Sequence, residues 1–256
     1  MAKRRYTIAI QARSGATRLP NKMSRPFYHD DTILDVILAR LVEGFDKRSI
    51  VVATSTSPSD QAIVEMAQRH GVRSARGSEN DVLGRVLAAV GQEPVDSVVR
   101  VCADNPFLRP EYIHDLLDLS DRTGCDYASY VMSDGRPSIL SHLGLFAEVI
   151  SYQTLKRIGA RASSQRHREH MTSHILDHLD EYHCEFIPVP DSLAAIRSLR
   201  LTVDTSADFA TCQRLYMELV EEHGTAFSVE QLVAKVRESP DVTAEMAREI
   251  ATNEKS

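Results

Sequence analysis

Short apolar runs alternate with helical patterns along the first half of the chain. Four runs read as strands, at 7–11, 49–54, 72–75 and 97–102. Apolar residues recur at helical spacing at 32–44, 59–70, 80–90 and 110–119. This alternation predicts an α/β fold with a mostly parallel sheet that helices cover on both faces. In such sheets, ligands bind at the carboxyl ends of the strands.

The second half of the chain is less regular. We expect a strand over 143–150, helices over 151–158 and 167–179, extended segments over 184–189 and 199–203, and helices over 206–223, 228–238 and 243–251. No internal repeat or shift of composition demands a second core. The sequence therefore predicts a single domain over 1–256, in which about 123–179 could form an insertion or a dimerisation arm.

Composition and charge narrow the class of protein. The 256 residues are 43% hydrophobic, which suits a packed core, and the net charge of −6 argues against a broad nucleic-acid-binding face. The four cysteines contain no C-x-x-C pair, so neither a disulfide framework nor a zinc ribbon is expected. No apolar run approaches a membrane span, and Tyr6–Ile10 is too short for a signal segment. We expect a cytoplasmic protein that binds neither nucleic acid nor membrane.

The loop after the first predicted strand is the strongest candidate for chemistry. It carries Arg13, Arg18 and Lys22, and Gly15 allows the backbone to approach a ligand closely. Arginine offers a bidentate fork to phosphate and lysine a mobile point charge, so three cations suit a triphosphate. The alternative is a solvated basic loop. Because the segment follows a buried strand and is stiffened by Leu19-Pro20, we favour a triphosphate site, although it is not a Walker A loop.

The segment Gln11-Ala-Arg-Ser-Gly-Ala-Thr-Arg-Leu-Pro-Asn-Lys22 resembles the N-terminal signature of the sugar-acid cytidylyltransferases. This superfamily contains the CMP-Kdo and CMP-sialic acid synthetases, and the resemblance is to its SpsF-like branch. Further segments agree in collinear order, at 50–54, 76–85, 99–106, 168–172 and 199–205. The resemblance implies a nucleotide-diphospho-sugar-transferase-like α/β fold.

The resemblance implies roles for the residues of the loop. Arg13 and Lys22 would be triphosphate ligands with Arg18 close by, and all three are assigned to catalysis. Gln11 and Ala12 would approach the nucleoside through backbone groups. The nucleotide-binding set also includes Ser14 and Gly15. Departures from the branch occur at Ser14, Ala16 and Asn21, where methionine, serine and glycine are more usual.

Two aspartates are candidates for a divalent cation. Asp104 directly follows a predicted strand, where a carboxylate can hold a metal, although it could also serve a turn before Pro106. By resemblance, Asp104 and Asp204 would both bind Mg²⁺. The alternative for Asp204 is a cap for the helix that begins near Ser206.

Three further residues are assigned to the nucleotide. Gly77 permits close approach, and Ser78 could bond the base or ribose. The alternative is a connecting loop in which Ser78 caps the next helix. Arg100 lies within a predicted strand and is expected to point toward the pocket or a partner carboxylate.

The expected acceptor side lies at 143–148. The branch commonly has an aspartate where Phe146 stands, whereas Glu148 is retained, so an acceptor for sugar hydroxyls is lost and apolar area is gained. Histidines 167, 170, 174 and 178 follow one helical face, which favours a structural role at the surface or a subunit interface. Only His170, within Glu169-His-x-Thr172, matches the family pattern, and it is a candidate substrate contact.

Together these features predict transfer of CMP from CTP to a sugar acid or related small anionic acceptor. Pyrophosphate would leave, Mg²⁺ would be required, and the family implies a homodimer. Three alternatives stay open: another nucleoside triphosphate as donor, a phosphate or phosphonate as acceptor, and a non-catalytic or glycosyltransferase-like member that only binds a nucleotide.

Overall fold

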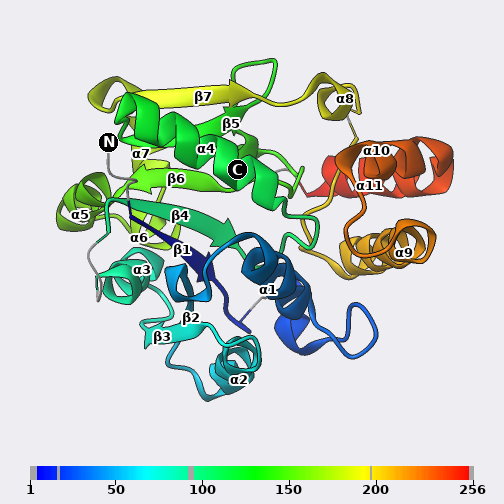
Figure 1. Ribbon diagram of the computed structural model, residues 1–256, viewed down its shortest axis with the longest axis horizontal. Helices are drawn as coiled ribbons and strands as arrows, with labels where there is room; N and C mark the ends of the chain where they lie inside the picture. The colour runs from blue at the N-terminus through cyan, green and yellow to red at the C-terminus, as the bar shows by residue number, and fades with distance from the viewer. Residues whose placement is uncertain (1–4, 16–17, 92–94, 197, 254–256) are drawn as a thin grey trace.

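A seven-stranded sheet with the order β3-β2-β1-β4-β6-β5-β7 runs through the centre of the protein (Figure 1). The computed structural model describes residues 5–15, 18–91, 95–196 and 198–253, so Ala16 of the candidate loop lies outside the described residues. The strands are β1 Tyr6–Gln11, β2 Ile50–Ser55, β3 Arg73–Gly77, β4 Ser97–Cys102, β5 Tyr127–Val131, β6 Glu148–Ser151 and β7 Cys184–Pro188. Neighbouring strands are parallel except that β6 is antiparallel to both β4 and β5. The predicted mostly parallel sheet is confirmed.

Helices cover both faces of this sheet. They are α1 Ile33–Gly44, α2 Gln61–Arg69, α3 Val82–Val90, α4 Pro110–Thr123, α5 Tyr152–Arg161, α6 Gln165–Glu169, α7 Ser173–Asp177, α8 Asp191–Ala194, α9 Ser206–His223, α10 Val229–Glu238 and α11 Pro240–Thr252. Successive residues of β1 divide between two apolar clusters, because side chains alternate along a strand. Ile8 and Ile10 pack with α1, α2 and α4, whereas Ala9 packs with α3, α5 and α7.

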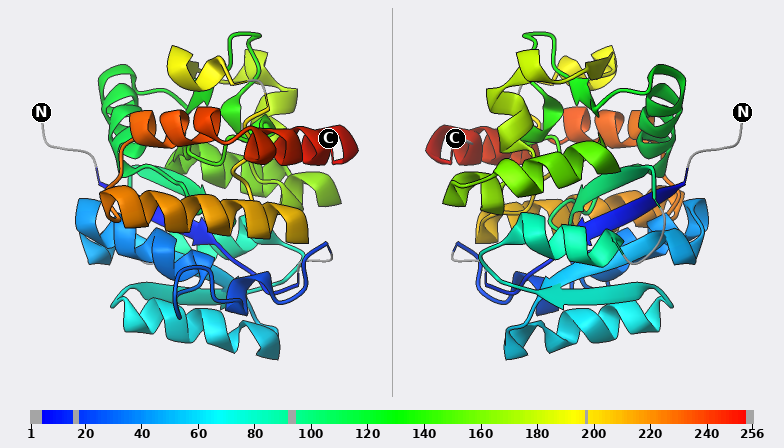
Figure 2. Two further views of the ribbon diagram at one scale, coloured as in Figure 1. Left: turned by 90° about the vertical axis from the view of Figure 1, so that its right-hand side faces the viewer. Right: turned by 90° about the vertical axis from the view of Figure 1, so that its left-hand side faces the viewer.

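The last three helices lie side by side at one end of the sheet, as Figure 2 shows in its left-hand view. Helix α9 begins with a capping box in which Thr205 and Asp208 bond each other's backbone amides. Helix α10 begins with a second box formed by Ser228 and Gln231. Among the described residues, no helix is long and apolar enough to span a membrane.

In the second half, β5 and α8 were not predicted, and two predicted elements differ from the structure. The predicted strand over 143–150 is shorter, and β5 and β6, both within 123–179, belong to the main sheet. The predicted helix over 167–179 is wrong, because the chain leaves helical geometry at His170 and divides into α6 and α7. The break turns Met171 and Thr172 into the core, where both are almost fully buried.

Candidate active site

A cavity of about 320 Å³ opens at the carboxyl ends of β1 and β4. The end of β1 and the segment after it form one wall, which we call the cation loop (residues 11–22). The end of β4, the turn at His170 and the segment before α9 complete the cavity. The lining residues are Gln11, Ala12, Arg13, Gly15, Arg18, Lys22, Met23, Cys102, Ala103, Asp104, His170 and Asp204. The structure thus brings most of the candidate residues together from four separate parts of the chain.

Each cation of the loop is paired with a carboxylate from another segment. Arg13 Nη2 lies 3.0 Å from Glu169 Oε1 at the end of α6. Arg18 Nη2 lies 3.4 Å from Asp204 Oδ1. Three ion pairs therefore hold the loop against the opposite wall, the third being that of Lys22.

Lys22 is the most deeply placed of these cations. The residue is only 7% exposed, its Nζ donates to the Val203 carbonyl at 2.7 Å, and it lies 3.6 Å from Asp104 Oδ2. Asn21, directly before it, adopts φ 59°, in the left-handed region that glycine and asparagine tolerate best.

Asp60, which sequence reasoning missed, fixes the path of the cation loop. Its Oδ1 accepts the Ser14 N–H at 2.7 Å, and Ser14 Oγ donates to the Ser59 carbonyl at 3.2 Å. Burial raises the pKa of Asp60, but hydrogen bonds from Ser55 and Ser14 outweigh it and lower the pKa overall. Because the amide of Ser14 is occupied by Asp60, Ser14 anchors the loop in this structure.

Asp104 and Asp204 share one wall of the cavity. The Asp104 carbonyl accepts the Val203 N–H at 2.9 Å, which joins the end of β4 to the segment that carries Asp204. Asp104 Oδ1 is buried and has no hydrogen-bond partner among the described residues. A buried carboxylate oxygen without a donor is costly unless a cation satisfies it. The two carboxylates therefore fit a divalent cation that completes its shell with phosphate oxygens and water.

Arg100 and Glu148 form a buried ion pair beneath the cavity. They are 6% and 1% exposed, and Arg100 Nη1 donates to Glu148 Oε2. Tyr127 donates to Glu148 Oε1, and Thr172 Oγ1 donates to Oε2 at 3.4 Å. Arg100 Nε donates to Gln11 Oε1 at 3.0 Å, so the predicted partner carboxylate of Arg100 exists and its guanidinium orients Gln11. With both oxygens occupied, Glu148 does not line the cavity.

Phe146 also lies away from the cavity. Its ring stacks against both Tyr112 and Tyr130, with centroids 4.8 and 4.4 Å away, and the residue is 6% exposed. The phenylalanine at this position therefore adds to the apolar core. Phe146 is therefore not among the residues that line the cavity.

The segment after β3 lies next to the cation loop but outside the cavity lining. A Cβ on Gly15 would come within 2.5 Å of Glu79 Oε1, which shows how closely the two segments approach. The Ser78 carbonyl accepts from Arg85 Nη1 at 2.8 Å. The alternative role of Ser78 as a helix cap is wrong, because Asp81 caps α3 by accepting the Gly84 N–H at 2.8 Å.

The histidines divide into two groups because the chain turns at His170. His170 lines the cavity, where partial burial lowers its pKa more than Glu169 raises it. The rings of His167, His174 and His178 gather elsewhere, with His174 5.0 and 4.7 Å from the other two. Within the described ranges, no group of three or more His, Cys, Asp or Glu residues is arranged to hold a metal ion.

Two residues behind Asp204 were also missed from the sequence. Arg200 Nε and Nη2 donate to the two oxygens of Asp208 at 2.6 and 2.8 Å, and Arg200 Nη2 lies 3.5 Å from Asp204 Oδ2. The only sequence signal was the spacing of Thr205 and Asp208, which is that of a capping box. Nothing in the pattern identified Arg200 as the buried partner.

Comparison with known proteins agrees with this fold. The family model described as "Cytidylyltransferase" matches residues 7–233. The chain is 30% identical over 241 residues to the spore coat polysaccharide biosynthesis protein SpsF of Bacillus subtilis, covering 92% of this chain and 95% of that protein. A solved cytidylyltransferase from Leptospira borgpetersenii aligns with a TM-score of 0.81 and 25% identity over 94% of this chain and 97% of its own.

A more distant structure shares the fold. The CMP:2-keto-3-deoxy-manno-octonic acid synthetase, solved with CTP, aligns with a TM-score of 0.60 and 14% identity over 84% of this chain and 99% of its own. The fold is that of a nucleotidyltransferase. The chain belongs to the cytidylyltransferase family, and it is a CTP-dependent nucleotidyltransferase. This membership confirms the resemblance seen in the sequence.

Proposed function

We propose that the enzyme transfers CMP from CTP to a sugar acid or a related small anionic acceptor, with Mg²⁺ bound by Asp104 and Asp204. The observation that carries the proposal is the cavity in which three cations of one loop face two aspartates, one with a buried oxygen that has no donor among the described residues. SpsF is named for spore coat polysaccharide biosynthesis, which supports a sugar-like acceptor. We further propose that the enzyme acts in the cytoplasm as a homodimer.

In this reaction an acceptor oxygen attacks the α-phosphorus, and the bond from that phosphorus to the bridging oxygen of pyrophosphate breaks. Negative charge then accumulates on the departing pyrophosphate. Arg13, Arg18 and Lys22 would stabilise this charge from positions that the fold sets in advance. Asp104 and Asp204 would hold the cation, which neutralises phosphate charge when it is bound. Catalysis by positioning and electrostatics suits a site with little other chemistry.

The two substrates would occupy opposite sides of the cavity. Gln11 and Ala12 at the end of β1 would contact the nucleoside, and the segment of Gly77 and Ser78, which approaches the loop where Glu79 meets Gly15, would border the nucleotide. The turn that carries Glu169 and His170 faces the cation loop from the other side and is proposed as the acceptor wall. This assignment replaces 143–148, since Phe146 and Glu148 are buried away from the cavity.

Nucleotide and metal should bind cooperatively. In the free protein Arg18 and Lys22 are paired with the same aspartates that would hold the cation. A triphosphate bound alone would break these ion pairs and place its negative charge beside the two carboxylates. A metal–triphosphate complex replaces both partners, because its phosphates pair with Arg18 and Lys22 and its cation pairs with the aspartates. We expect removal of divalent cations with EDTA to weaken CTP binding roughly 5- to 150-fold, the usual range of coupling between sites. Calorimetry with and without Mg²⁺ measures this, and equal affinities would contradict it.

Glu169 should compete with the triphosphate for Arg13. We expect Glu169→Gln to strengthen metal-free CTP binding about 2- to 5-fold, because an ion pair with both side chains about one-third exposed is worth at most about 1 kcal/mol. Glu181→Gln is the matched control, since it removes an exposed pair with Arg161. Weaker or unchanged binding by Glu169→Gln would contradict the competition.

Pyrophosphate release with CTP, Mg²⁺ and a panel of sugar acids, sugar phosphates and phosphonates tests the proposed function. We expect release with CTP and a sugar-acid acceptor, and little with ATP, GTP or UTP. The proposal would be contradicted if no nucleoside triphosphate gave pyrophosphate release and CTP did not change the melting temperature of the protein. Release that requires a phosphate or phosphonate would instead replace the acceptor class.

A further inference from the structure

The backbone of the turn that presents Asp204 is fixed by a buried ion pair. The N–H groups of Asp204 and Thr205 both donate to Asp208 Oδ2 at 2.9 Å. Asp208 is in turn held by both Nε and Nη2 of Arg200, whose side chain has no exposed surface. These hydrogen bonds fix the path of the backbone past the cavity, but they do not fix the side chain of Thr205.

Helix α11 supplies the contact for that side chain. Thr205 Oγ1 donates to Glu249 Oε2 at 2.7 Å and accepts the Asp208 N–H at 3.1 Å. A hydroxyl has a single hydrogen, so its direction toward Glu249 leaves a lone pair for the Asp208 amide. Asn253 Nδ2 donates to the same carboxylate oxygen at 3.3 Å and keeps it near the turn. Glu249 therefore fixes the hydroxyl that caps α9, one residue after Asp204.

Helix α11, Pro240–Thr252, lies beyond residue 233, where the match to the family model ends. It packs against α9 and α10 rather than against the sheet. We propose that Glu249 is a positioning residue of the metal site, which through Thr205 holds the Asp204 carboxylate where it takes the divalent cation. The inference rests on the proposed metal-binding role of Asp204. Helix α11 would then take part in the reaction by positioning a metal ligand, a role separate from that of the cation loop.

Removal of Glu249 should change the requirement for metal more than the binding of nucleotide. Loss of a residue that orients a metal ligand usually costs about 10- to 100-fold in metal affinity or activity. Glu249 acts through one intervening residue, so we expect the lower end of this range. No hydrogen bond or ion pair joins the described residues of the cation loop to α11, so the affinity for CTP without metal should stay unchanged.

The test is a titration of activity with Mg²⁺ at saturating CTP and acceptor. For Glu249→Ala we expect the half-saturating Mg²⁺ concentration to rise about tenfold. Binding of Mn²⁺, measured by electron paramagnetic resonance with a non-hydrolysable CTP analogue, should weaken by the same factor. Glu249→Gln keeps an oxygen that accepts the Thr205 hydroxyl and should restore most of the loss. Glu245→Ala, one turn earlier in α11, is the control.

Wild-type metal dependence in a folded Glu249→Ala variant would overturn the inference, as would equal losses in Glu249→Gln and Glu249→Ala. If Glu249→Ala does not fold, Thr205→Val breaks the same hydrogen bond and should show the same rise, with Thr205→Ser as its conservative partner. If the wild-type enzyme needs no divalent cation, the proposed function fails instead. The two failures are therefore distinguishable.

Discussion

Replacement of Lys22 with methionine is expected to lower kcat/KM for CTP about 100- to 1,000-fold, the usual effect of removing one preorganised charge-stabilising donor. Methionine keeps much of the volume of the lysine side chain, which is 9% exposed, but it cannot donate to phosphate. The variant also leaves Asp104 without its ion-pair partner. Steady-state pyrophosphate release at saturating Mg²⁺ measures the loss.

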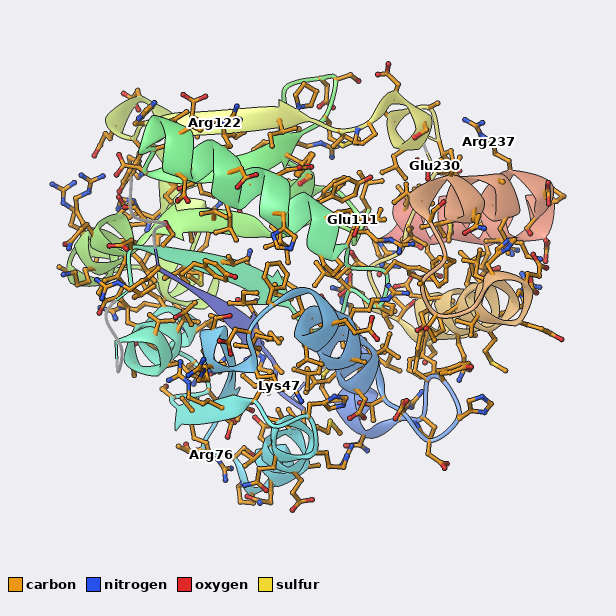
Figure 3. The ribbon with its side chains drawn as sticks, in the orientation of Figure 1. Lys47, Arg76, Glu111, Arg122, Glu230 and Arg237 are labelled. Atoms are coloured by element: carbon orange, nitrogen blue, oxygen red, sulfur yellow. The ribbon has the colours of Figure 1, made fainter. Side chains whose placement is uncertain are left out.

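Lys47→Met provides a matched control for this prediction. Lys47, labelled in Figure 3, is exposed and lies just before β2, at the amino end of the sheet and therefore opposite the cavity. We expect its kcat/KM to stay within about twofold of wild type, since surface substitutions away from specific contacts have small effects. A Lys22→Met enzyme with normal kcat/KM would remove Lys22 from the active site.

Replacement of Glu148 with glutamine is expected to lower the free energy of unfolding by about 3–5 kcal/mol, because it leaves the buried Arg100 without a counter-charge. The pair lies between β4 and β6, where Arg100 and Glu148 are direct neighbours in the register. Chemical denaturation followed by circular dichroism measures the change. Thermal unfolding should shift downward in parallel.

Glu111→Gln is the control for Glu148, because Glu111 is an exposed glutamate at the start of α4 (Figure 3). It should change the free energy of unfolding by less than about 0.5 kcal/mol. A Glu148→Gln protein as stable as wild type would show that the ion pair is not needed for folding. Loss of the pair should also release Gln11, so residual activity is expected to fall with stability.

The sequence was informative where one local pattern decides the structure. Three apolar runs became β1, β2 and β4, since a strand covered on both faces is a short continuous apolar segment. The cation loop was found because Arg13, Arg18 and Lys22 lie within ten residues of one another. Asp104 was predicted because it lies at the carboxyl end of a strand. In a parallel sheet, this position lies beside the loop that follows the neighbouring strand.

The partners of these residues could not be predicted, because they depend on distant contacts. Glu169 meets Arg13 from 156 positions away, and Arg100 meets Glu148 from 48 positions away. Periodicity placed His170 on a helix with three other histidines, but that helix is interrupted at His170, where Met171 and Thr172 turn into the core. Glu148 and Phe146 were assigned to the acceptor from a sequence motif alone. Neither a motif nor the spacing of apolar residues indicates which face of a strand lies next to a cavity.

The reversed direction of β6 has a consequence for how this protein can diverge. Since β6 begins beside the cavity and ends at the far edge, where Tyr152 N–H donates to the Asp96 carbonyl, the chain must travel back before Glu169 can meet Arg13. The stretch 152–172 is thus a single excursion of the chain, and its length sets the position of the proposed acceptor wall. One residue inserted there would displace that wall, whereas the cation loop and Asp104, which precede it, and Asp204, which follows it, would keep their positions. Substitutions and insertions within 152–172 can therefore change the acceptor, while the residues proposed to bind the triphosphate stay the same.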